Sequence, residues 1–225
     1  NIAGGDYGTW NINPYASAGN SNIWNFAGNV TTTGTLQPFA GTGITGTTVN
    51  TSNFSLTAKR ISIGATSNLG AVALNLGSSA VTLSNGTSDA ILMTDAAVTH
   101  TLDMGSASVD VKGNVLFVNG SASVTVTPGT STLTWTNTSG TLTYAPNGQS
   151  LYNLTLNGSG STVAPNGAVD INNNLIITAG TFTSPSSMTI GGNYSNSGTF
   201  TNSSGTVTFD ATDTGNTLGG TLSGT

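Results

Sequence analysis

The sequence of 225 residues lacks cysteine and glutamate, and it carries little charge of either sign. Without cysteine, the chain has no disulfide framework and no thiolate metal site. Charged residues make up 5% of the chain, against about 25% in an ordinary globular domain. With only three cations, no basic patch is available for nucleic-acid phosphates or an anionic membrane surface. No run of about 18 apolar residues occurs either, so the sequence predicts no membrane-spanning helix.

Small polar residues take the place of the missing charge. Threonine (41), glycine (31), serine (27) and asparagine (26) together account for 125 of the 225 residues. All four are indifferent or poor in helix interiors, whereas threonine suits strands and the other three suit turns. The apolar residues fall in short alternating runs, which favours an ordered β-protein over a disordered chain.

Short runs with a period of two fill the chain from Phe54 to Thr127, and turn residues separate them. The connections between the runs are short and regular, so the sequence predicts an all-β fold. The stretch from Ser88 to Met104 is the one helix candidate, and the alternation of its second half favours two strands instead. The other runs that we interpret as strands are 54–58, 60–64, 72–76, 80–83, 108–111 and 123–127.

One hexapeptide returns almost unchanged later in the chain. Ser-Gly-Thr-Leu-Thr-Tyr at 139–144 returns as Ser-Gly-Thr-Val-Thr-Phe at 204–209. Internal repeats are typical of solenoids, and three coils of roughly 22 residues would fill the interval between the two copies. The sequence therefore predicts a β-solenoid with roughly three rungs per 65-residue block, with turn asparagines such as 172–174 forming amide ladders between rungs. A β-sandwich subunit of the pilus type is the alternative fold.

The C-terminal part of the chain resembles a known family. Its segments 152–156, 174–182, 188–200 and 205–209 resemble the tandem β-solenoid repeats of large bacterial surface proteins, similar to filamentous-haemagglutinin-like adhesins. The resemblance covers residues 139–225 well, 54–138 only in style, and 1–50 not at all. It implies a secreted or surface-displayed stalk or fibre, and it brings no catalytic motif.

Aromatic residues set the N-terminal part apart. We divide the chain into residues 1–50, a cap or docking segment, and residues 51–225, the solenoid repeats. Bulky aromatics can cover the open end of a solenoid, accept a neighbouring subunit by strand addition, or bind a sugar. The candidate docking or sugar contacts are Tyr7, Trp10, Tyr15 and Trp24.

The chain offers little for catalysis. Its eight aspartates mostly stand alone, without the paired carboxylates of glycoside hydrolysis. The single histidine, His100, lies in an alternating run, and we interpret it as an ordinary surface or half-buried residue. Thr-x-Thr strands are frequent, as in ice-binding solenoids, but their sequence intervals are irregular. We therefore predict no catalytic residue, no metal site and no cofactor.

These observations predict a structural segment of a secreted or cell-surface adhesin or extracellular fibre that assembles head-to-tail. The expected partners are copies of itself or other cell-surface components, with a polysaccharide as a further candidate. A carbohydrate- or ice-binding β-solenoid module is the first alternative, and a degraded β-helix enzyme is another. The chain opens at Asn1 and closes at Thr225 within its own repeat pattern, which is typical of a mature or excerpted piece of a longer protein.

Overall fold

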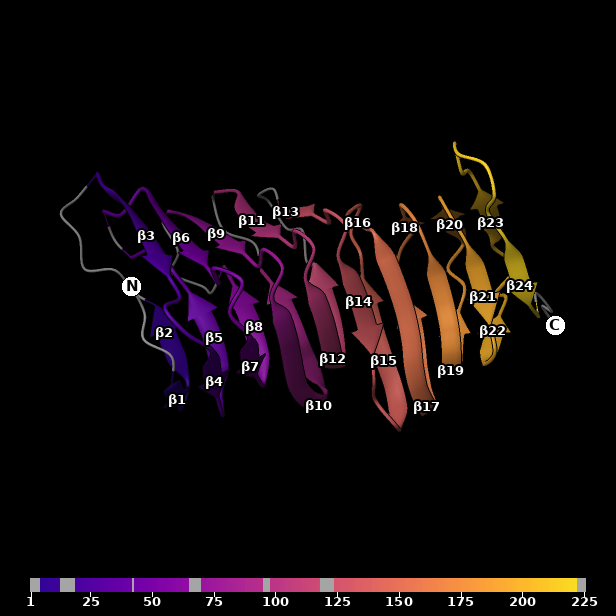
Figure 1. Cartoon of the computed structure of the whole chain (residues 1–225), viewed down its shortest axis with the longest axis horizontal. Helices are drawn as coiled ribbons and strands as arrows, with labels where there is room; N and C mark the ends of the chain where they lie inside the picture. Colours follow the sequence, from indigo (N-terminus) through magenta and orange to yellow (C-terminus); the bar gives the residue numbers. More distant parts are fainter. Residues whose placement is uncertain are drawn as a thin grey trace.

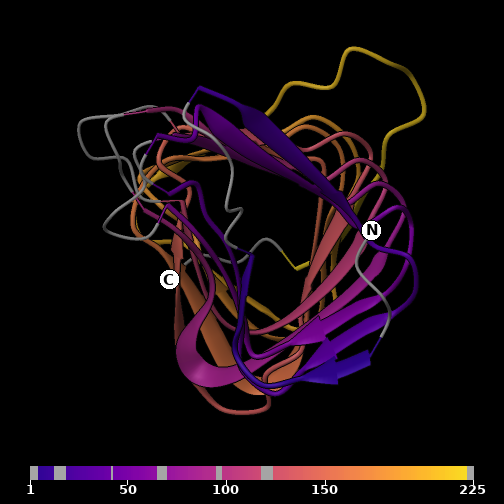
Figure 2. The ribbon, with the colours of Figure 1, turned by 90° about the vertical axis from the view of Figure 1, so that its left-hand side faces the viewer.

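The computed structural model describes residues 5–12, 19–41, 43–64, 70–94, 98–117 and 124–221. Every regular element within these residues is a β-strand, and the strands coil around one axis as a β-solenoid of about eight turns. Figure 1 shows the turns side by side from the N-terminal to the C-terminal end, and Figure 2 looks along the axis. The all-β solenoid predicted from the sequence is confirmed, and the β-sandwich alternative is wrong.

Each full turn contributes a strand to each of three faces, which we call faces A, B and C. All strand pairs between turns are parallel. Four long strands bend across the corner between faces A and B. Face A is built from β1 (Gly5–Tyr7), β4 (Val30–Thr32), β7 (Leu56–Ala58), β10 (Ala80–Met93), β12 (Ser108–Phe117), β14 (Thr132–Trp135), β17 (Asn153–Pro165), β19 (Leu175–Thr183), β21 (Tyr194–Asn196) and β24 (Leu218–Gly220). Face B is built from β2 (Trp10–Ile12), β5 (Thr35–Pro38), β8 (Arg60–Ile63), the second parts of β10, β12, β17 and β19, β15 (Gly140–Ala145) and β22 (Thr199–Thr201).

The third face carries two sheets in succession along the axis, one for the N-terminal turns and one for the C-terminal turns. The first sheet of face C contains β3 (Ser21–Asn25), β6 (Gly46–Asn50), β9 (Ala71–Asn75), β11 (His100–Asp103) and β13 (Val124–Thr127). The second contains β16 (Ser150–Leu151), β18 (Val169–Ile171), β20 (Ser187–Ile190) and β23 (Thr206–Phe209). The predicted pair of strands between Ser88 and Met104 corresponds to the end of β10 and to β11.

The length of a turn changes along the stack. Asn25 and Asn50, which are equivalent in successive turns, lie 25 residues apart, whereas Asn174 and Asn193 lie only 19 residues apart. In the C-terminal half, three successive turns take the chain from Leu154 to Leu218, which is close to the predicted block length. The predicted three rungs per block therefore describe this half correctly.

The repeated hexapeptide, however, does not mark equivalent positions. Leu142 of the first copy lies on face B and pairs with Val163. Val207 of the second copy lies on face C and pairs with Met188. The interpretation of the two copies as boundaries of one repeating block is wrong, because any inward apolar residue flanked by outward threonines fits any face of the tube.

The core is a single hydrophobic column along the axis. Side chains alternate in and out of each strand, so each inward residue packs on its equivalents in the turns before and after it. On face A the column runs through Leu133, Leu154, Leu175 and Tyr194, all of which are almost completely buried. Burial of apolar surface stabilises by about 25 cal/mol per Å². When the turns stack, their thin apolar stripes join into one core, which is large enough to stabilise the fold.

Asparagine ladders hold the turns in register. The Asn50 Nδ2 donates to the Asn25 Oδ1, and the Asn75 Nδ2 donates to the Asn50 Oδ1, each over 2.7 Å. A second ladder joins the C-terminal turns, where the Asn193 Nδ2 donates to the Asn174 Oδ1 over 2.9 Å. The predicted amide ladders are confirmed. Because a slip of one residue would turn these side chains to the opposite side of the strand, the ladders fix the pairing of the turns.

The stack also runs through the predicted boundary at residue 50. Strand β6, which ends at Asn50, pairs along its whole length with β9 and with β3. The described strands between residues 5 and 50 thus form turns of the same tube as the later repeats. Any capping or docking by this region takes place on the end of a continuous solenoid.

Candidate functional site

Of the predicted contact residues, Trp10 occupies an inward position in the first described turn of face B. It lies in β2 opposite Leu36, which is fully buried. Its ring is half-buried against the core, 5.9 Å from the ring of Phe26 between centroids. The Trp10 ring therefore covers the end of the apolar column.

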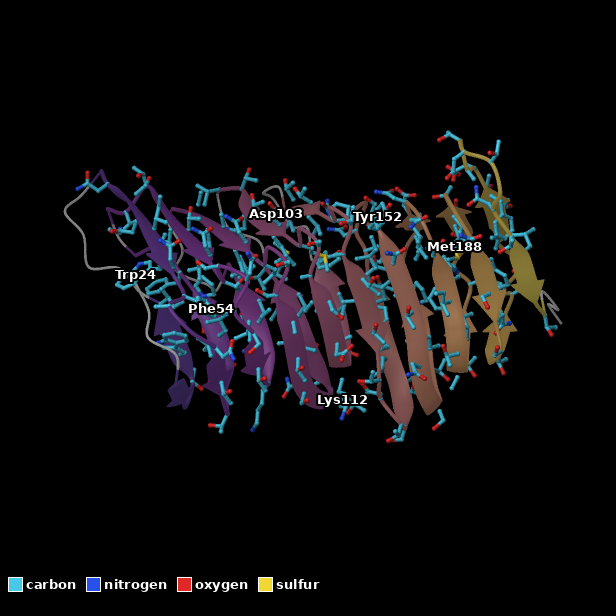
Figure 3. All side chains as sticks on the ribbon, viewed as in Figure 1. Trp24, Phe54, Asp103, Lys112, Tyr152 and Met188 are labelled. Atoms are coloured by element: carbon cyan, nitrogen blue, oxygen red, sulfur yellow. The ribbon has the colours of Figure 1, made fainter. Side chains whose placement is uncertain are left out.

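Trp24 likewise covers the end of the apolar column, on face C. It lies in β3 opposite the buried Val49 and packs on the core, and Figure 3 labels it near the N-terminal end of the stack. The neighbouring Ile23 points outward and is 68% exposed. The Trp24 Nε1–H and the Asn22 Nδ2 are buried donors without an acceptor among the described residues.

The two tyrosines among the candidate contacts contribute less to this end of the tube. Tyr7 lies in β1 and pairs through its backbone with Thr32, whereas Tyr15 lies outside the described residues. The structure thus brings Trp10 and Trp24 to the same end of the tube, both packed onto the core. Their role as contacts to a partner or a sugar stays a prediction.

The C-terminal end carries a second aromatic cluster, which the sequence did not single out. The Tyr194 ring lies 5.9 Å from Phe200 and 6.1 Å from Phe209, edge-to-face in both cases. Beyond it, Leu218 occupies the inward position above Tyr194 and yet is 58% exposed, because no described residue lies on top of it. An inward apolar residue that remains exposed marks an open end of the core.

No family model, curated protein or solved structure matches this chain.

Catalytic chemistry has little to build on. In the part of the chain that the structure describes, no three histidine or aspartate side chains gather into a group that could hold a metal ion. None of the described residues forms a helix long and apolar enough to cross a bilayer. The absence of an enzymatic activity stays a prediction.

The prediction for His100 is wrong in its exposure. Its side chain is fully buried, and its Nδ1 accepts a hydrogen bond from the Val72 N–H over 3.1 Å. The backbone of Gly64 lies so close that an added Cβ would come within 2.7 Å of the His100 Cδ2. The period-two alternation carries the signal that could have revealed this burial, because His100 has the same parity in the strand as the inward Leu102 and Met104. The contacts make His100 a structural part of the core.

Tyr144 is a second titratable group that is fully buried. Its ring is fully buried between Phe117, 6.1 Å away, and Trp135, 5.6 Å away, both edge-to-face. The hydroxyl has no hydrogen-bond partner among the described residues. Burial, and to a lesser degree the negative charge of Asp170, raise the pKa of Tyr144 above its ordinary value. A buried hydroxyl without a partner has a desolvation cost that phenylalanine avoids.

We expect Tyr144→Phe to stabilise the solenoid by about 1 kcal/mol at neutral pH, because it removes that cost without leaving a cavity. The advantage should grow as the pH rises above about 10, where the unfolded tyrosine ionises and the buried one cannot. Urea denaturation of both proteins at neutral and alkaline pH measures the difference. Tyr152→Phe, at a half-buried tyrosine, serves as the control. A loss of stability in Tyr144→Phe would show that the hydroxyl has a partner.

Proposed function

We propose that this chain is a structural segment of a secreted or cell-surface fibre or adhesin, and that copies join end to end. The support is architectural. A solenoid with one continuous core forms a rod, and its successive turns stack around one axis (Figure 2). A copy placed on the end of another would extend the same three faces and the same apolar column.

The observation that carries the proposal is the pair of ends. At the C-terminal end, Leu218 and Val207 occupy inward positions but remain exposed or half-buried. At the N-terminal end, Trp10 and Trp24 present half-buried rings on the same column. No described strand pairs with the outer edge of β3, β23 or β24. Exposed apolar ends with free backbone edges favour association by strand addition.

The net charge and the sequence resemblance also support an extracellular fibre whose copies associate. A net charge of −5 over 225 residues opposes close approach of copies only weakly. The resemblance of residues 139–225 to the repeats of filamentous-haemagglutinin-like surface proteins supports an extracellular location. The carbohydrate alternative has less support from the two tryptophans, because both rings lie against the core instead of forming an outward platform.

We expect Leu218→Lys to abolish end-to-end assembly, since it places a charge at the centre of the contact. Sedimentation velocity and negative-stain electron microscopy would show filaments for the wild type and single rods for the variant. Ile176→Lys is the matched control: Ile176 is also apolar and exposed, at 38%, but it points outward from face A. A wild type that stays monomeric at high concentration, or equal loss in both variants, would contradict the proposal.

A further inference from the structure

Threonines form an ordered array on face B in the C-terminal half. The outward positions of β15, β17, β19 and β22 align in register, so that one column runs Thr141, Thr162, Thr181 and Thr199. Beside it, Thr143 pairs with Ala164 and Thr183 pairs with Thr201. Figure 1 shows these four strands side by side along the axis. Seven of the eight positions in this threonine array are threonine.

The array is regular in space although it is irregular in sequence. The sequence intervals within its first column shrink from Thr141 to Thr199, because successive turns shorten. Parallel strands nevertheless lie about 4.8 Å apart, and outward residues along one strand lie about 6.6 Å apart. The pairing therefore converts uneven spacing in the chain into a two-dimensional lattice of hydroxyl and methyl groups.

The array is also rigid and uncharged. Threonine is branched at Cβ, so its side chain is held in few rotamers on a strand. The inward residues between the threonines, such as Leu142, Val163 and Phe182, are fully buried and hold the backbone in place. Between residues 139 and 205 the one charged residue is Asp170, and it lies on face C in β18. Little conformational entropy would be lost when such a surface binds.

A periodic surface gains most from a periodic ligand, because each repeat adds a contact of the same kind. A mineral lattice would require charged side chains, and the array has none. Crystalline polysaccharides are bound through aromatic rings stacked on the sugars, and the aromatic residues of these strands, Tyr144, Phe182 and Phe200, are all buried inside. Methyl and hydroxyl groups in a regular lattice suit an ordered layer of water.

From this geometry we propose that the threonine array is an ice-binding surface. Its hydroxyl groups donate to and accept from water molecules, and its methyl groups occupy the spaces between them. The site differs from the end-to-end contact, because its threonines point outward from the side of the tube, whereas the end contact uses inward residues such as Leu218.

Face A provides a natural contrast. Its outward column continues from Thr134 and Thr155 to Ile176 and Ser195, and in the other direction it reaches Asp110. A charge and a bulky isoleucine interrupt that column. The same chain therefore presents a regular face and an irregular face with similar backbone geometry.

The test compares Thr181→Lys in the array with Thr155→Lys on face A. Both threonines are half-buried and lie in the middle of a parallel sheet. Thermal hysteresis in a nanolitre osmometer and partition of the protein into a slowly growing ice hemisphere are the two readouts. We expect the wild type and Thr155→Lys to show both effects, and Thr181→Lys to lose both.

Circular dichroism melts establish that each variant is folded. If Thr181→Lys does not fold, Thr199→Lys, at the exposed end of the same column, replaces it. The proposal is overturned if the wild type shows neither hysteresis nor uptake into ice, or if the face A variant loses as much as the face B variant. Binding to crystalline chitin or cellulose in place of ice, sensitive to Thr181→Lys, would also overturn it and would assign the array to an ordered polysaccharide.

Discussion

Trp135→Ala is expected to destabilise the solenoid by about 3–5 kcal/mol, the range for removing a large buried aromatic side chain. Trp135 is fully buried in β14, stacks edge-to-face on Tyr144, and donates from its Nε1 to the Gly113 carbonyl over 2.9 Å. Its loss leaves a cavity in the middle of the column and an acceptor without its donor. Equilibrium urea denaturation followed by circular dichroism gives the change in the free energy of unfolding.

Trp135→Phe is the matched variant, because it keeps an apolar ring and loses mainly the hydrogen bond. We expect it to cost about 1–2 kcal/mol, less than the alanine change. Equal costs for the two variants would mean that the bond to Gly113 dominates and that packing contributes little. A cost below about 1 kcal/mol for Trp135→Ala would contradict the buried position of the ring.

Gly158→Ala is expected to destabilise by about 3 kcal/mol, through overpacking against rigid backbone. Gly158 lies where β17 bends from face A to face B, and a Cβ there would come within 1.9 Å of the Asn137 carbonyl oxygen. The next turn also approaches closely, since a Cβ on Gly180 would lie 2.4 Å from the Gly158 carbonyl oxygen. Neither neighbour can move without separating turns. Thermal and urea denaturation measure the loss.

Gly167→Ala serves as the control for this prediction. The nearest heavy atom to a Cβ at Gly167 is the Pro146 Cγ at 3.7 Å, an ordinary contact. We expect this variant to lie within about 0.5 kcal/mol of the wild type. If the two glycine variants lost the same stability, the close approach of turns at Gly158 would not be the cause.

The fold could be predicted from the sequence because a solenoid needs only a repeated local pattern. Alternating runs, short turns and an approximately constant coil length lead to stacked parallel strands. The pattern does not fix which face a run occupies, since Leu142 and Val207 look alike and lie on different faces. Assignment to a face depends on how many residues each corner uses, and that number changes from turn to turn.

The candidate sites, too, could be predicted only in part, because the sequence pattern does not fix where each residue lies on the tube. The irregular intervals between Thr-x-Thr motifs counted against an ordered array, yet turn shortening aligns Thr141, Thr162 and Thr181 in space. Aromatic residues set the N-terminal region apart in the sequence, but the sequence alone could not show that Trp10 and Trp24 turn toward the core. Where apolar residues occupy both parities of a strand, as Ile23 and Trp24 do, inward and outward positions become distinct only when the pairing between turns is known.

The hydrogen bonds between turns, including the asparagine ladders, run along the axis of the tube. A pulling force along that axis acts on every interface between turns, and an outermost turn, which has a neighbouring turn on one side only, is expected to separate first. Each released turn, such as the one from Leu56 to Val81, extends to about 80 Å from a rung about 4.8 Å thick. A fibre made of this chain would absorb mechanical shock by lengthening in discrete steps, and it would regain its length as the turns close again.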